Sequence, residues 1–198
     1  MAQQSLFRSA LGEAFDRLAP VLKRHYDLAP EQEAIVQGPM RAWNRFAWAR
    51  AFAPFMPIPA ERVQVCVRNR GLMDRGEVCY EWQREFRYPN GVVLSYTLTR
   101  PARGGSPACV LDTFNRPPNV AITLALEVSA DGSALRQMSV GPQFVIRGTR
   151  YVALPRLLHV RSIAVERAVD EHTIHTEVVV SHPLFGQMFG YSGTLEVS

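Results

Sequence analysis

The stretch that decides the fold is Glu77–Tyr88, EVCYEWQREFRY, followed by the turn Pro89-Asn90-Gly91. Its side chains alternate between two kinds, and a period of two is typical of a β-strand whose faces meet different surroundings. The turn predicts that the chain reverses into a second strand carrying Val92, Leu94, Tyr96 and Leu98. One face of the first strand is apolar and aromatic with a single arginine in its middle: Val78, Tyr80, Trp82, Arg84, Phe86 and Tyr88.

Alternation of this kind begins at residue 61 and recurs to the end of the chain, with short connections between the runs. Strands in series without intervening helices predict an antiparallel sheet, and the sequence has no GxGxxG or P-loop pattern. Long sheets of this type curl or close, because an open edge invites unwanted pairing. We therefore predict a mainly β fold at the α+β border, a strongly curved antiparallel sheet or partial barrel with N-terminal helices packed on it. Further strands are expected at 63–67, 108–114, 119–128, 134–140, 159–168, 172–180 and 187–197.

The N-terminal part, 5–57, is predicted to be helical. Ser5 suits a helix N-cap, and Pro20 predicts a kink or break. A second helix is expected over 42–55. Residues 1–198 are interpreted as a single domain, with β-structure over 61–198. The first helix shows one apolar stripe at three- and four-residue spacing: Phe7, Leu11, Ala14, Phe15, Leu18 and Leu22.

Composition excludes several classes of protein. The chain has 198 residues and a net charge of +4, and Lys23 is the only lysine among 22 basic residues. The arginines are scattered singly, which argues against nucleic acid as a partner. Three cysteines do not make a disulfide framework and suit a reducing compartment. With no signal peptide or spanning segment in the sequence, we expect a cytoplasmic protein without membrane insertion.

Arg84 is the most informative charged residue, because a buried guanidinium is costly unless it is paired. It either meets an internal acid, binds an anionic or carbonyl-bearing ligand, or lies along the rings with its head in solvent. Asp112 is a candidate partner, since it points the same way as Val110 and Phe114. An Arg84–Asp112 pair would be structural, whereas an unpaired buried Asp112 would have a raised pKa and act as an acid or base.

Other chemistry finds less support in the residues. Glu81 and His159 are further candidates for proton exchange, and a histidine at a strand end is the plainer interpretation of His159. The histidines and cysteines lack metal-ligand spacing, and no serine lies in a GxSxG motif. We therefore expect no metal and no resident cofactor.

Several short motifs resemble a bacterial family of uncharacterised domains that occur alone or at the C-terminal side of saccharopine-dehydrogenase-like, NAD(P)-binding proteins. The resemblance implies that a copy standing alone needs a separate NAD(P)-dependent reductase for any redox reaction. Asp112 departs from it where a glutamate is expected, and 115–117 departs where a glycine turn is usual. The motifs are the helix 10–18, Trp82-x-Arg84-x-Phe86, Leu154–Leu158 followed by Glu166, Pro183–Gly186, and Tyr191-Ser192-Gly193.

These observations leave three hypotheses for function. The first is a binding module whose β-lined cavity holds an apolar or amphipathic, lipid-like small molecule, with Arg84 on its polar end. The second is a cofactor-free isomerase, cyclase or dehydratase of a biosynthetic metabolite, in which Arg84 polarises a carbonyl while Asp112, Glu81 or His159 exchanges the proton. The third is a docking domain for a separate oxidoreductase or for a second copy, through Trp43, Phe46, Trp48 and Phe52. The predicted cavity lining is Tyr80, Trp82, Arg84, Phe86, Tyr96 and Tyr191.

Overall fold

A computed structural model describes residues 4–46, 56–102 and 108–198. Three short helices come first: α1 (Leu6–Leu11), α2 (Glu13–Asp16) and α3 (Pro20–Tyr26). Eleven strands follow within the described ranges, and a single 3₁₀ turn lies at Arg156–Leu158. The strands are β1 (Glu33–Asn44), β2 (Ala60–Asp74), β3 (Glu77–Tyr88), β4 (Gly91–Pro101), β5 (Cys109–Phe114), β6 (Val120–Val128), β7 (Ala134–Arg147), β8 (Arg150–Ala153), β9 (Arg161–Ala168), β10 (Thr173–His182) and β11 (Gly186–Val197).

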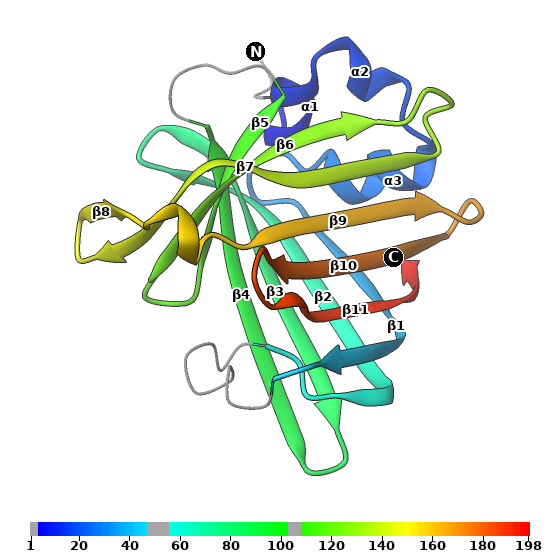
Figure 1. Cartoon of the computed structure of the whole chain (residues 1–198). Coiled ribbons are helices and arrows are strands. Elements are labelled where there is room, and N and C mark those ends of the chain that lie inside the picture. The colour runs from blue at the N-terminus through cyan, green and yellow to red at the C-terminus, as the bar shows by residue number, and fades with distance from the viewer. Residues whose placement is uncertain (1–3, 47–55, 103–107) are drawn as a thin grey trace.

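The described strands form one antiparallel sheet that closes on itself, in the order β6-β5-β4-β3-β2-β1-β11-β10-β9-β7-β8. Closure comes from β7, which pairs with β9 on one side and with β6 on the other. Ten strands therefore make a closed barrel, and β8 extends from it as a short hairpin with the end of β7 (Figure 1). The predicted mainly β fold is confirmed, and closure removes the open edges that a curved sheet would leave.

The helices gather at one end of the barrel, away from the turn that joins β3 to β4 (Figure 1). Phe7 of α1 is fully buried, and its ring lies edge-on to Tyr80 and Trp82 at centroid distances of 5.2 and 6.2 Å. Leu22 and Tyr26 of α3 are equally buried. This end of the interior is therefore filled by helix side chains, and open space is left toward the other end. In the described part of the chain, no helix has both the length and the apolar character to cross a membrane.

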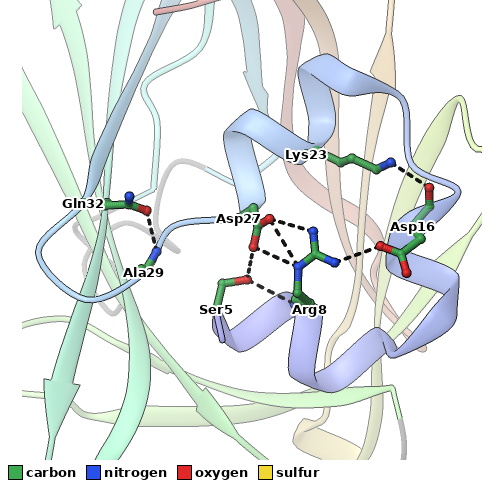
Figure 2. A network of polar contacts seen from close by, with 7 residues as sticks. All are labelled: Ser5, Arg8, Asp16, Lys23, Asp27, Ala29 and Gln32. Carbon is green, nitrogen blue, oxygen red and sulfur yellow. Dashed lines mark hydrogen bonds and ion pairs between the residues drawn. The ribbon is translucent and has the colours of Figure 1, made fainter. Parts of the chain in front are cut away.

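A polar cluster holds the helices to one another (Figure 2). The Arg8 guanidinium binds Asp27 and Asp16, each with a shortest contact of 2.8 Å, and the Ser5 hydroxyl donates to Asp27 at 2.7 Å. Ser5 also accepts the Arg8 amide at 3.3 Å, so it caps α1 as predicted. Pro20 begins α3 at its first turn, where its missing N–H costs nothing.

The helix expected over 42–55 is not observed where the structure describes that stretch. Residues 33–44 form β1 instead, which pairs with β2 on one side and β11 on the other. Trp43 packs over Gly190, whose lack of a Cβ lets the indole lie against the β11 backbone. Strand pairing on both sides satisfies the backbone of this apolar run, so tertiary context outweighs the helical spacing of its aromatics. Trp48 and Phe52 lie outside the described residues.

Candidate ligand-binding cavity

Strand β3 divides its side chains between the interior and the outer surface of the barrel, as its alternation predicts. Tyr80, Trp82 and Phe86 are buried. Glu85 and Arg87 form an ion pair on the other face, with 2.8 Å between Arg87 Nη2 and Glu85 Oε2. Arg84 faces the interior between Val67 of β2 and Ser95 of β4, so the embedded arginine lies inside the barrel.

A cavity of about 390 Å³ occupies the interior on the side away from the helices. Its walls are mainly aliphatic and aromatic, with Phe86, Phe114 and Val178 among them. A few polar side chains interrupt this surface, and Arg84 is the only one of the described lining residues that carries a permanent charge. Small-molecule sites commonly combine such apolar walls with a few polar groups that orient the ligand. The polar lining residues are Arg84, Ser95, Gln143, Ser162 and Tyr191.

Arg84 lies where this cavity meets a second, smaller space. Its Nη1 donates to Thr97 Oγ1 at 3.0 Å, and its guanidinium lies 5.2 Å from the ring centroid of Trp82. Both spaces are lined by Arg84 and by Tyr191. No carboxylate of the described residues lies within ion-pair distance of Arg84, so one cation faces the apolar cavity without an ion-pair partner there.

Asp112 is buried on β5 and does not form the structural pair with Arg84 considered above. Its Oδ1 accepts a hydrogen bond of 2.6 Å from Thr99 Oγ1, which in turn accepts from Trp82 Nε1 at 2.9 Å. Burial raises the pKa of Asp112 to about 6, and the Thr99 hydrogen bond and the charge of Arg84 only partly oppose this rise. Arg84 and Asp112 interact through space across the smaller chamber.

The smaller chamber, about 90 Å³, contains a second carboxylate in a dense polar setting. Glu166 accepts from the Tyr26 hydroxyl at 2.6 Å and lies 3.2 Å from His25 Nε2, while Thr176 donates to its other oxygen at 3.3 Å. Burial opposes ionisation of Glu166, but His25, Tyr26 and Arg84 together lower its pKa. Two acids with opposite pKa shifts therefore line one chamber.

The structure brings some of the sequence-predicted residues together and separates others. Trp82, Arg84 and Asp112 line the smaller chamber, and Arg84, Phe86 and Tyr191 line the main cavity. Tyr80 is fully buried and donates to the His25 carbonyl at 3.0 Å, so it belongs to the packing under the helices.

Three predicted residues lie away from both spaces. Tyr96 pairs across the sheet with Gln83, and its hydroxyl donates to Glu81 at 2.6 Å on the face opposite to Arg84. Neither Tyr96 nor Glu81 lines the cavity. His159 follows the 3₁₀ turn, and its Nε2 is 3.0 Å from the Leu154 carbonyl, also outside the lining.

His25 and Glu166 line the smaller chamber, and Tyr26 is hydrogen-bonded to Glu166, but none of the three was proposed from the sequence as a site residue. His25 and Tyr26 end α3, and Glu166 is 140 residues away along the chain from Tyr26. The one sequence signal is Glu166 itself, an acid that follows the apolar run 163–165, and the structure buries it on β9. Within the described residues, no cluster of three or more His, Cys, Asp or Glu side chains is arranged to hold a metal ion.

Among known proteins, the chain matches a family model but no curated protein. A family model described as Domain of unknown function (DUF4166) matches residues 18–195. The matched range begins just before α3 and ends within β11, so it includes all of β1 to β10, most of β11 and every lining residue named above.

Proposed function

We propose that this chain, which belongs to the DUF4166 family of domains of unknown function, binds an apolar or amphipathic small molecule in its barrel. The ligand's apolar part occupies the main cavity and its anionic or carbonyl-bearing end meets Arg84. The observation that carries the proposal is the combination of an apolar cavity of about 390 Å³ with a single permanent charge among its described lining residues.

The position of Arg84 supports an anionic or carbonyl end rather than a purely apolar ligand. The guanidinium contacts the hydroxyls of Thr97 and Tyr191, and no acid among the described residues forms an ion pair with it. A guanidinium in apolar surroundings gains most from a partner that accepts charge-assisted hydrogen bonds. A carboxylate or a polarised carbonyl satisfies that demand, whereas a hydrocarbon leaves it unmet.

Titration calorimetry with a linear fatty acid and with the alcohol of the same chain length tests this assignment. Arg84→Gln should weaken binding of the acid roughly 10- to 100-fold, because a charge-assisted hydrogen bond is lost, and should change binding of the alcohol little. Arg87→Gln, on the outer face of the same strand, is the matched control. Equal losses of affinity for the acid and the alcohol would show that Arg84 does not recognise the polar end of the ligand. The binding function would be refuted if the native protein bound neither compound and native mass spectrometry detected no bound lipid.

The smaller chamber supports a second candidate, a cofactor-free enzyme of the isomerase, cyclase or dehydratase type acting on a biosynthetic metabolite. Asp112, with a pKa of about 6, lies in the same chamber as Arg84, which suits proton exchange next to a polarised carbonyl. Incubation of bound carbonyl compounds in D₂O, followed by proton NMR, tests for exchange at the α-carbon. Exchange that Asp112→Asn abolishes while binding persists would support the enzyme, and no exchange for any bound compound would leave binding alone.

A separate NAD(P)-dependent reductase as partner and a bacterial, cytoplasmic setting belong to the same proposal. Cys66, Cys79 and Cys109 are all free thiols, which suits a reducing compartment. Light scattering of the protein alone and with a candidate reductase separates docking or self-association from an independent binding module.

A further inference from the structure

Exposed apolar side chains gather where the cavity meets the surface. Leu157 and Leu158 of the 3₁₀ turn are 62% and 55% exposed, and Leu184 and Phe185 in the β10–β11 turn are 66% and 48% exposed. We call these four residues the mouth patch. Leu158 also lines the main cavity, so the patch continues directly into the binding site.

The two turns that carry the mouth patch are joined by specific contacts. His182 Nε2 lies 2.7 Å from the Leu157 carbonyl, and the His182 ring stacks on Phe185 at a centroid distance of 4.9 Å. Phe185 in turn lies edge-on to Phe46 beyond β1. These contacts hold the two turns together, so the exposed apolar side chains form one continuous surface.

The two segments that carry the mouth patch contain no acidic residue. Residues 132–165 contain five arginines and no acid, and residues 178–195 contain no acid and no arginine. Arg147, Arg150, Arg156 and Arg161 are exposed near the end of β7, in β8, in the 3₁₀ turn and at the start of β9. None of these four forms an ion pair with another described residue, whereas the exposed Arg41 pairs with Glu61.

We propose that the mouth patch docks on the surface of a membrane rich in anionic phospholipids, with the cavity opening onto that surface. Exposed leucines and a phenylalanine enter the boundary between headgroups and acyl chains, and the surrounding arginines bind the phosphates. The apolar interior then continues the apolar phase of the membrane, so an amphipathic ligand passes between them without crossing water. The docking is peripheral, and it extends the proposed function from holding such a ligand to collecting or delivering it.

Co-sedimentation with vesicles tests the docking. Vesicles of phosphatidylglycerol and phosphatidylcholine in equal parts should bind the protein, and pure phosphatidylcholine should bind it far more weakly. Arg150→Gln with Arg156→Gln should lower binding to the anionic vesicles about 25-fold, roughly fivefold for each arginine. The matched control is Arg17→Gln with Arg167→Gln, which removes the same charge from exposed positions at the helix end.

The apolar contribution is tested by Leu157→Ser with Leu184→Ser, for which we expect a loss of at least roughly tenfold. Val92→Ser with Leu94→Ser removes apolar side chains of similar exposure from β4 and is its control, with thermal unfolding to verify that each variant is folded. Equal binding to neutral and anionic vesicles, or equal effects of the patch and control variants, would overturn the proposal. Mouth-patch variants that lose vesicle binding but keep their fatty-acid affinity in vesicle-free calorimetry would support docking. A native protein that binds vesicles but no fatty acid would count against the cavity function alone. Binding to an acidic protein but to no vesicle would refute the membrane as the partner.

Discussion

Asp112 makes the stability of this barrel depend on pH in a direction that is unusual for a carboxylate. Its pKa rises from an ordinary value of 3.8 to about 6 because the group is buried. Below pH 4 the carboxyl is protonated in both the folded and the unfolded chain, so its ionisation does not affect the free energy of unfolding. Between pH 4 and 6 only the unfolded chain releases the proton, and the free energy of unfolding therefore falls as pH rises. Above about pH 6 the full penalty remains.

The size of this penalty follows from the two pKa values. Since 1.36 kcal/mol corresponds to one pKa unit, the change from 3.8 to about 6 amounts to about 3 kcal/mol. Asp112→Asn removes the ionisation but keeps an oxygen that accepts the hydrogen bond from Thr99. We expect the variant to gain up to about 3 kcal/mol relative to the native protein between pH 4 and pH 7.5. The gain at neutral pH is the reverse of what loss of a structural Arg84–Asp112 ion pair would produce.

Urea unfolding followed by tryptophan fluorescence at pH 4, 5, 6 and 7.5 measures this difference. The pKa of Glu166 is lowered, so its contribution to the free energy of unfolding falls toward acid pH. This happens in both proteins, and the contribution cancels in the comparison. Glu196→Gln, at an exposed position of β11, controls for the removal of one negative charge. If the difference between Asp112→Asn and the native protein is the same at all four pH values, burial does not raise the pKa of Asp112, and the predicted dependence on pH is refuted.

Two further predictions concern the helix end of the barrel. Asp27→Asn should cost about 1–2 kcal/mol at pH 7, because the Arg8 contacts lose their charge, and this cost should fade as pH falls through the lowered pKa of Asp27; a cost unchanged at pH 2.5 in urea titrations would contradict it. Gly132→Ala should destabilise the fold strongly, because φ there is 71° and a Cβ would clash with the Arg17 carbonyl. Gly148→Ala, at φ 60° with open space around it, should cost only the backbone strain of a positive φ. Equal melting temperatures for the two alanine variants would refute the close approach.

Much of the barrel was predictable because strand alternation is a local property. The interior face of β3, with Trp82, Arg84 and Phe86, follows directly from the period of two. On the neighbouring strand β4 the face of Tyr96 was not predictable, because β4 has apolar side chains on both faces near its start. Its interior positions are the more polar Ser95 and Thr97, and Val92 and Leu94 are exposed. Hydrophobicity alone therefore assigns the wrong face where a barrel interior is partly polar.

The sequence by itself determined that β-strands follow an N-terminal helical segment, that their order is antiparallel, and that one arginine faces inward on an aromatic strand. Those properties depend on neighbours a few residues apart. Only the tertiary structure decided that β7 closes the barrel against β6 and β9, that β1 is a strand, and that Arg84, Asp112, His25 and Glu166 line one chamber. These four residues come from β3, β5, α3 and β9, so their meeting depends on the closure and shear of the whole sheet. The alternation of side chains within one strand does not determine which distant strands pair to close the barrel.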